Sequence, residues 1–202
     1  HQVIPVERCC IQKPQADAAA QALRTYLRLY GVSCYDEKTR RGLVRYLYVR
    51  TNGAGQSLLC VLVNGKKLPH ERELVDLLRQ AVPEAVGVVL GVNTRPTGAV
   101  LGQEYRTLWG ADVLTDTLCG LTFRLSVPSF YQVNREQAER LYAKAIEYAQ
   151  LTGEETVLDL YCGAGTITLA LASHAKRVLG AEIVPEAIDD ARENAARSGV
   201  EN

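Results

Sequence analysis

The sequence predicts two folds in succession: an α+β domain with a mostly antiparallel sheet over residues 15–127, and the truncated start of an open α/β domain over residues 128–202. Three observations support this prediction. Short β-prone runs punctuated by turns dominate the first part, with two helical segments among them. Strand and helix patterns alternate in the second part. A glycine turn joins the first strand of that part to the helix that follows it.

The elements of the first domain are recognised by periodicity and by the turn residues between them. Apolar residues recur at helical spacing in two segments, and alternating or continuous β-prone runs fill the rest. Asn52–Gly55 separates two such runs and makes them a hairpin. In chain order we expect a helix over 15–29, strands over 43–50 and 57–63, a helix over 71–81, and strands over 86–92, 105–109, 112–118 and 121–127.

The second domain follows the order strand, turn, helix, strand, helix after one leading helix. The apolar run before the glycine turn is short and bounded on both sides, which is typical of a buried strand. Gly199 ends the last helix. We expect a helix over 135–150, a strand over 157–160, a helix over 166–173, a strand over 177–181 and a helix over 184–198.

Composition and chain ends restrict the kind of protein. The 202 residues, 47% hydrophobic and 23% charged, suit one or two globular cores. No apolar run approaches the roughly 20 residues of a membrane helix, and no signal peptide is recognisable, so we expect a cytoplasmic protein with no membrane partner. The chain starts with His1, has no methionine, and stops two strands into the α/β unit. Since such sheets usually have about five strands, we expect an internal piece of a longer protein.

The glycine turn indicates a nucleotide ligand without a pyrophosphate. Gly163 and Gly165 let backbone approach a ligand, but a dinucleotide fingerprint would need a glycine where Thr168 stands, and no phosphate-binding lysine follows. Asp159 ends the first strand, where its carboxylate can face an ammonium group. Glu182 ends the second, where it can take both ribose hydroxyls of an adenosine. An adenosine with an amino-acid tail is S-adenosylmethionine. The alternative is an ordinary α/β glycine turn with acids there by chance.

Charge and cysteines give weaker signals. Residues 1–125 hold 16 Lys/Arg against 11 Asp/Glu, and residues 126–202 hold 7 against 12. This charge difference indicates that any nucleic acid would contact the first part. The alternative is ordinary variation in surface charge. We expect three cysteines near apolar runs to be core thiols, and no zinc site, because no C-x-x-C pair occurs. The three thiols are Cys34, Cys60 and Cys119.

Two motifs together resemble the RNA (uracil-5-)-methyltransferases, which act on transfer or ribosomal RNA. The first is the segment 129–134 (Ser-Phe-Tyr-Gln-Val-Asn). The second is the segment 157–166 (Val-Leu-Asp-Leu-Tyr-Cys-Gly-Ala-Gly-Thr), followed by Glu182. The resemblance implies a Rossmann-like S-adenosylmethionine-dependent methyltransferase domain over residues 128–202.

The resemblance also assigns the cofactor contacts. It places them on Gln132, Tyr161, Thr166 and Glu182. Tyr161 can offer a ring to the ligand, and Thr166 stands at a helix N-terminus, where a hydroxyl can bind the amino-acid end. Thr166 departs from the asparagine that the family often has there. The alternative for Gln132 is a loop amide that caps the following helix.

Some members of the family hold a [4Fe–4S] cluster on three cysteines near the N-terminus and a fourth further along. Residues 6–9 (Val-Glu-Arg-Cys) resemble the segment with the fourth, which makes Cys9 the implied metal ligand and residues 1–14 a remnant of an iron–sulfur region. The other three ligands would precede His1. The alternative is an incidental surface thiol.

The resemblance implies no catalytic residue in this chain. In the family a cysteine attacks carbon 6 of uracil and a carboxylate removes the carbon-5 proton, and both would lie beyond Asn202. Cys162 lies in the cofactor turn, and we expect it to pack beneath the ligand. The chain alone should therefore be inactive.

We expect the partner of the whole protein to be RNA, ribosomal more than transfer. The cations Lys38, Arg40, Arg41 and Arg45 are candidates for phosphate contacts or simply a solvated face. The rival interpretations are a methyltransferase acting on a protein or small molecule, and a non-catalytic RNA-binding module.

Overall fold

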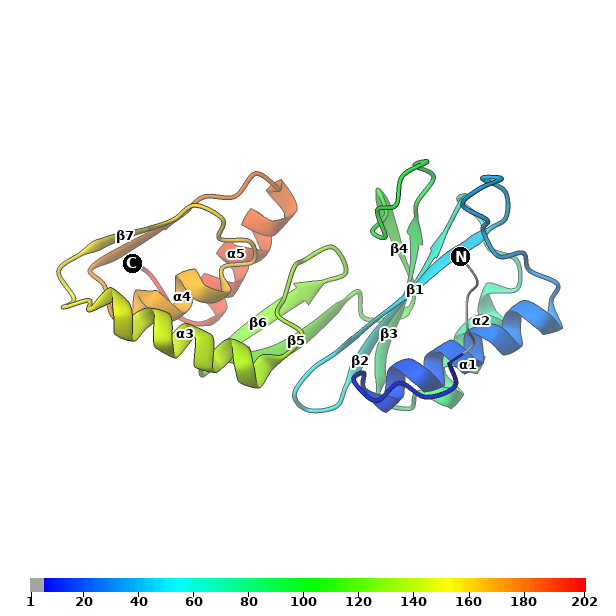
Figure 1. Cartoon of the computed structure of the whole chain (residues 1–202), viewed down its shortest axis with the longest axis horizontal. Coiled ribbons are helices and arrows are strands. Elements are labelled where there is room, and N and C mark those ends of the chain that lie inside the picture. Colours follow the sequence, from blue (N-terminus) through cyan, green and yellow to red (C-terminus); the bar gives the residue numbers. More distant parts are fainter. Residues whose placement is uncertain (1–5) are drawn as a thin grey trace. The chain divides into compact units, whose positions relative to one another are not determined.

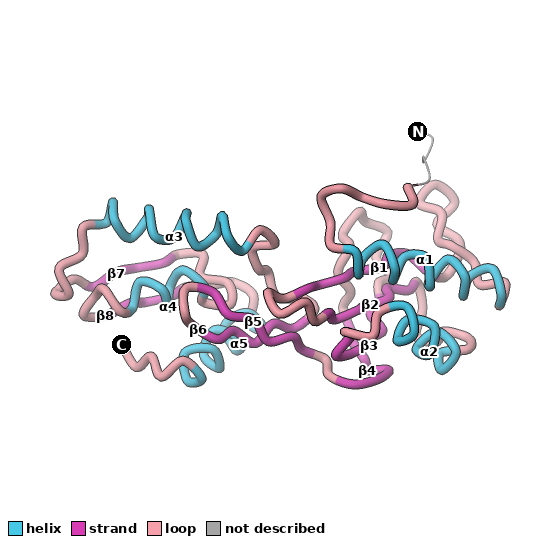
Figure 2. Tube along the Cα trace, turned by 90° about the horizontal axis from the view of Figure 1, so that it is seen from below, coloured by secondary structure: helices cyan, strands magenta, loops and turns pink. Residues whose placement is uncertain are grey.

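A computed structural model describes residues 6–202, and the chain divides into two compact units at Leu114 and Thr115. Figure 1 shows the elements of each unit along the chain, and Figure 2 shows the same elements from below. We describe each unit by itself. None of the helices formed by residues 6–202 is both long and apolar enough to cross a bilayer.

The first unit is a four-stranded sheet with two helices on one face. Its elements are α1 (Pro14–Leu29), β1 (Val44–Thr51), β2 (Ser57–Val63), α2 (Glu71–Ala81), β3 (Ala85–Val92) and β4 (Glu104–Gly110), in the sheet order β1-β2-β3-β4. β1 and β2 form the expected hairpin, and β3 pairs with β4 antiparallel. β2 and β3 are parallel, because α2 carries the chain back across the sheet between them. The sheet is thus mixed, with two of its three pairings antiparallel.

The main core lies between this sheet and the two helices. α1 and α2 lie side by side against the sheet in both views (Figures 1 and 2). Every residue of β2 is buried, and Leu59, Val61 and Val63 face the helices. Tyr26 of α1 is fully buried and its hydroxyl donates a hydrogen bond to the carbonyl oxygen of Pro69. A central strand buried on both faces explains its uninterrupted apolar sequence.

The second unit begins with a hairpin and continues as a parallel strand–helix–strand unit. The unit boundary falls within β5 (Val113–Leu118), most of which belongs to the second unit. The elements that follow are β6 (Leu121–Ser126), α3 (Arg135–Ala149), β7 (Thr156–Asp159), α4 (Thr166–Ala172), β8 (Arg177–Gly180) and α5 (Pro185–Arg197). β7 and β8 pair in parallel, with Asp159 opposite Gly180. The carboxyl ends of both strands therefore meet at one edge. After α5 the chain returns beside β8, where the amide of Val178 donates to the carbonyl oxygen of Asn202 at 2.8 Å.

The two units divide earlier than the boundary that we expected after residue 127. The hairpin β5–β6 packs within the second unit, because Phe123 and Leu125 share a core with Tyr142 of α3 and Leu169 of α4. The alternating pattern of these strands shows that one face is buried but not which core it meets.

Of the three cysteines expected to be core thiols, only Cys60 is buried. Burial raises the pKa of its thiol to about 12. The prediction was wrong for Cys34 and Cys119, which are exposed. Cys119 occupies the hairpin turn with Gly120, both at positive φ, as type I′ turns require. Turn positions project from the sheet even when apolar strands flank them.

Candidate functional site

The glycine turn lies between the end of β7 and the start of α4. Gly163 and Gly165 have φ of +52° and +84°, in the left-handed region that favours glycine. A Cβ on Gly165 would lie 3.3 Å from the Cβ of Ala191 in α5, so the turn passes close against that helix. The amide of Gly165 donates to the carbonyl oxygen of Cys162 at 2.8 Å, which closes the turn.

Backbone hydrogen bonds continue the pairing of β7 and β8 into this turn. The amide of Ala181 donates to the carbonyl oxygen of Asp159 at 2.8 Å, and the amide of Cys162 donates to that of Ala181 at 3.1 Å. The glycine turn and the residues after β8 are thereby held against each other. Asp159 and Glu182 consequently lie at the same edge of the strand pair.

Asp159 holds the two ends of the turn through its side chain. One carboxylate oxygen accepts from the amide of Tyr161 at 3.2 Å, and the other accepts from the hydroxyl of Thr168 at 2.6 Å. Two carboxylate oxygens offer about four acceptor positions, so two remain for a ligand. The structure thus fixes the carboxylate and leaves it able to face a cationic group.

Glu182 links the end of β8 to the glycine turn. One of its oxygens accepts from the amide of Gly163 at 3.2 Å, and the other accepts from the amides of Ile183 at 2.7 Å and Val184 at 3.0 Å. The backbone N–H groups of Val184, Ile183 and Gly163 hold the pKa of this carboxyl below its usual value. Glu182 is therefore ionised at neutral pH and positioned without any ligand.

The remaining predicted contacts differ in how they are held. The side chain of Tyr161 is 89% exposed beside the turn, free to meet a ligand. The hydroxyl of Thr166 lies 2.8 Å from that of Tyr142, within hydrogen-bonding distance. Gln132 is half-buried, and no described hydrogen bond joins it to the turn. It does not cap α3, because the Asn134 side chain accepts from the amide of Gln137 at 3.3 Å as the N-cap.

Cys162 lies beneath the turn, with only 6% of its surface exposed. A Cβ on Gly180 would come within 3.0 Å of its sulfur, so the thiol packs directly against β8. Burial raises the pKa of this thiol, and the carboxylates of Asp159 and Glu182 raise it further. A protonated, buried thiol is a poor nucleophile, in agreement with a packing role.

Two buried polar residues of α5 hold the site and escaped the sequence analysis. Asp190 accepts hydrogen bonds from the hydroxyls of Ser126, at 3.0 Å, and of Ser129, the first residue of the segment 129–134. Asn194 is fully buried and donates to the carbonyl oxygen of Ala164, inside the glycine turn, at 3.0 Å. The side-chain oxygen Oδ1 of Asn194 accepts a hydrogen bond from the backbone amide of Arg124 in β6 at 2.7 Å.

These two residues therefore fasten both motif segments to one helix. Their spacing of four positions places them on one face of α5. In the sequence, an acid and an amide four positions apart on the inward face of an amphipathic helix could have indicated these buried polar side chains.

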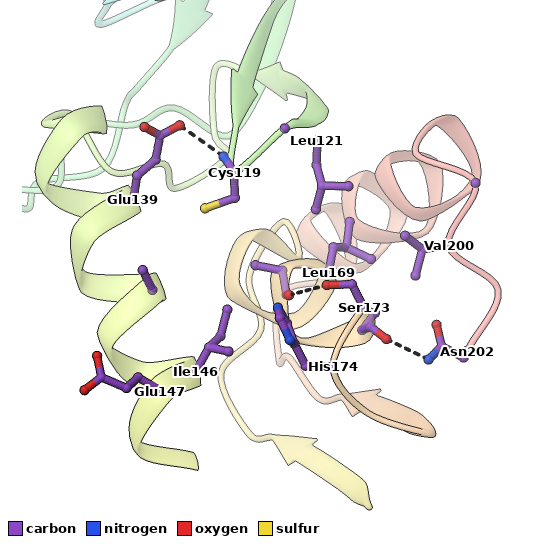
Figure 3. A pocket seen from close by; sticks show the side chains of 15 residues that line it. Cys119, Leu121, Glu139, Ile146, Glu147, Leu169, Ser173, His174, Val200 and Asn202 are labelled. Atoms are coloured by element: carbon purple, nitrogen blue, oxygen red, sulfur yellow. Dashed lines mark hydrogen bonds between the residues drawn. The ribbon is translucent and has the colours of Figure 1, made fainter. Parts of the chain in front are cut away.

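A separate groove of about 740 Å³ lies at the other end of α4 (Figure 3). α3, α4, the β5–β6 turn and the residues after α5 line it, and Ile146, Leu169 and Val200 supply apolar surface. Figure 3 also shows the Glu139 carboxylate accepting from the amide of Cys119, at 3.1 Å. None of the predicted cofactor residues lines this groove. It is thus distinct from the glycine turn, which lies at the N-terminal end of the helix.

Cys9 lies before α1, half-buried, and its amide is 3.3 Å from both carboxylate oxygens of Asp17. Within residues 6–202 no three His, Cys, Asp or Glu side chains are grouped to hold a metal ion. The described residues therefore do not by themselves fit an iron–sulfur cluster.

The four cations proposed for phosphate contacts separate into two kinds. Lys38, Arg40 and Arg41 are exposed. The side chain of Arg45 is fully buried and pairs with Glu37 at 3.0 Å. The prediction that Arg45 contacts phosphate is therefore wrong, because β1 directs its side chain inward.

Comparison with known proteins agrees with the resemblance of the motifs. The sequence profile of the tRNA (uracil-5-)-methyltransferases matches residues 15–202. The chain belongs to this family. The match includes both motif segments and the first unit from residue 15 onward, so the family assignment does not depend on the glycine turn alone.

Relatives of this family member are RNA methyltransferases by name. An uncharacterized RNA methyltransferase of Halalkalibacterium halodurans is 40% identical over 203 residues, which are 100% of this chain and 44% of the relative. One of Staphylococcus aureus is 43% identical over 196 residues, 96% of this chain and 43% of the relative. The chain thus spans less than half the length of the curated relatives that it matches.

A solved structure shows the same fold. The tRNA (uracil-54, C5)-methyltransferase of Pyrococcus abyssi, crystallised with S-adenosyl-L-homocysteine, matches 99% of this chain and 48% of its own, with a TM-score of 0.81 and 22% identity. The second unit of this family member therefore has the fold of an S-adenosylmethionine-dependent methyltransferase.

Proposed function

We propose that the whole protein transfers a methyl group from S-adenosylmethionine to carbon 5 of a uridine in RNA. The observation that supports this most directly is the edge where Asp159, Glu182 and the glycine turn meet, since both carboxylates are held there by turn amides. Family membership supports RNA as the substrate and uridine as the target. The bound cofactor supplies an electrophilic methyl group on sulfur.

The residues of this chain bind and orient rather than react. Glu182 accepts from the ribose hydroxyls of the adenosine, and Asp159 faces the ammonium group of its amino-acid tail. Gly163 and Gly165 allow close approach of the backbone, and Tyr161 lies against the ligand. Thr166 and Gln132 complete the contacts once Thr166 exchanges its bond to Tyr142 for one to the ligand.

The nucleophile and the base lie outside residues 1–202 in this proposal, because Cys162 is buried and protonated. The 202-residue chain should then transfer no methyl group, whereas the full-length protein should. Detectable methylation of RNA by the chain alone would contradict this assignment.

Cofactor binding is tested by titrating S-adenosylmethionine into the full-length protein by calorimetry. Glu182→Ala should weaken binding about 10- to 100-fold, because hydrogen bonds to a charged group contribute about 1.5–3 kcal/mol. Glu186→Ala is the matched control, an exposed glutamate in the first turn of α5. Equal affinities for all three proteins would remove Glu182 from the site.

The RNA target follows from a second experiment. Ribosomal and transfer RNA from cells lacking the gene are incubated with the full-length protein and a methyl-labelled cofactor. We propose ribosomal RNA first, with transfer RNA as the alternative that the family description favours. Nuclease digestion and mass spectrometry should show 5-methyluridine. A label found only on protein or small molecules would support the rival methyltransferase, and absence of cofactor binding would support the RNA-binding module.

An iron–sulfur role for Cys9 and a cytoplasmic location remain proposals. The cluster would require cysteines outside this chain, and we derive no step of the reaction from it. Iron analysis of anaerobically purified full-length protein, beside Cys9→Ser, tests it directly.

A further inference from the structure

Two loops of the first unit present four exposed cations. The loop between α1 and β1 presents Lys38, Arg40 and Arg41, and the loop between β3 and β4 presents Arg95. None of these four forms an ion pair with any residue in the described range 6–202. We call residues 36–41 and 93–97 the paired loops.

Backbone hydrogen bonds fix the first of the paired loops. The amide of Asp36 donates to the carbonyl oxygen of Arg41, and the amide of Arg40 donates to that of Asp36, both at 2.7 Å. The Asp36 carboxylate accepts from the amides of Lys38 at 3.0 Å and Thr39 at 2.7 Å. These bonds lower the pKa of the Asp36 carboxyl. Its charge is thus used to close the loop from which the three cations project.

The second of the paired loops is fixed by Asn93, which is fully buried. Its side-chain amide donates to the carbonyl oxygens of Ala99 at 2.7 Å and Val100 at 3.1 Å. Its own backbone amide donates to Val63 at the end of β2, at 2.8 Å. The loop that carries Arg95 is therefore anchored to the sheet.

Arg45 joins the two loops. One terminal nitrogen of its guanidinium donates to Asn93 and, at 2.7 Å, to the carbonyl oxygen of Arg95. The other donates to the carbonyl oxygen of Thr97 and to the Glu37 carboxylate, both at 3.0 Å. The planar fork of arginine suits such a set of acceptors, and lysine could not reproduce it. The buried side chain therefore positions both loops together.

We propose that the paired loops are a preorganised surface for RNA phosphates, with Lys38, Arg40, Arg41 and Arg95 as the contacts and Arg45 as a positioning residue. This inference depends on the proposed function, in which the substrate is RNA. Several cations spaced over two fixed loops suit an extended polyanion with successive phosphates. Loops ordered before binding lose little conformational freedom when the RNA arrives.

The test measures RNA binding to the full-length protein at several salt concentrations. The probe is a fluorescently labelled uridine-containing RNA stem-loop, followed by anisotropy. The loop variant combines Lys38→Ala, Arg40→Asn and Arg41→Ala, where asparagine tolerates the positive φ of 57° at Arg40. The control combines Arg24→Ala, Arg28→Ala and Arg72→Ala, which removes equal charge from exposed positions of α1 and α2.

The loop variant should bind more weakly and should reduce the slope of log affinity against log salt by about two, since each phosphate contact contributes about 0.7–0.9. The control should keep the wild-type slope, and all three proteins should bind S-adenosylmethionine equally. An unchanged slope in the loop variant, or an equal loss in the control, overturns the proposed surface. A wild-type protein that binds no RNA overturns the proposed function itself.

A double-mutant cycle tests the positioning role of Arg45. Arg45→Lys keeps the charge and loses the fork, so it should lower RNA affinity several-fold in the wild-type background. In the loop variant the same change should have a clearly smaller effect, because Arg95 is then the one proposed contact that Arg45 still positions. Equal losses in the two backgrounds overturn the positioning role.

Discussion

Replacing Asn194 by alanine should loosen the glycine turn from within α5. The side chain is fully buried and bonds the carbonyl oxygen of Ala164 at 3.0 Å and the amide of Arg124 at 2.7 Å. Alanine leaves both backbone groups without these partners. A buried polar group left unpaired costs about 1–3 kcal/mol, so the two together should cost about 3 kcal/mol.

The effect should be local and measurable by hydrogen exchange of the full-length protein. If the free energy needed to open the turn falls by about 3 kcal/mol, the amides of residues 160–166 should exchange about 100-fold faster. The first unit supplies an internal reference, since Asn194 and its two partners, Ala164 and Arg124, all belong to the second unit. Affinity for S-adenosylmethionine should fall in parallel, because the turn is the part that binds it in our proposal.

Arg192→Ala is the matched control on the same helix. Its side chain is 78% exposed, and within residues 6–202 its one ion pair is with Asp189, so the change should alter stability by less than about 0.5 kcal/mol. If the amides of residues 160–166 exchange as slowly in Asn194→Ala as in the wild type, the Asn194 side chain does not hold the turn, and our account of α5 is refuted.

Three further predictions concern single positions. Gly165→Ala should cost about 1–2 kcal/mol from the left-handed backbone alone, and calorimetry should show lost cofactor binding. Hydrogen bonds from Thr152 lower the pKa of the Glu155 carboxyl to about 2. The stability that ionised Glu155 contributes is therefore complete above about pH 4.5 and is lost as the pH falls towards 2. Thermal unfolding of Glu155→Gln, followed against pH, should lack this part of the pH dependence of stability. A thiol reagent should label the exposed cysteines at once, but Cys60 and Cys162 only after unfolding.

Most elements of the fold followed from local patterns. The helix expected over 71–81 and the strand expected over 57–63 have those bounds in the structure, because apolar spacing and turn residues define them without reference to the rest of the chain. The placement of the β5–β6 hairpin did not follow, since alternation along a strand does not say which helices cover it.

Side-chain burial was the other feature that the sequence could not supply. Arg45 lies among three exposed cations, and only the position of β1 relative to the β3–β4 loop turns its guanidinium inward. Asp190 likewise looks like one more surface acid of α5, next to Asp189, yet it is buried and binds Ser126 and Ser129. In both residues a buried charge is held by polar and charged partners from other segments of the chain, which composition does not reveal.

The carboxylates of the candidate site illustrate what the structure adds to a motif. The sequence placed Asp159 and Glu182 at the ends of two strands, and the structure shows each one already bonded to an amide of the turn between them. Because these bonds hold both carboxylates in place without a ligand, cofactor binding loses little conformational entropy in ordering them. The backbone amides also keep Glu182 ionised, because they lower the pKa of its carboxyl. A variant that keeps both acids but loosens the turn should therefore also lose affinity for S-adenosylmethionine. Asn194→Ala removes the support of the turn and Glu182→Ala removes a ligand contact, so the two variants test the same site independently.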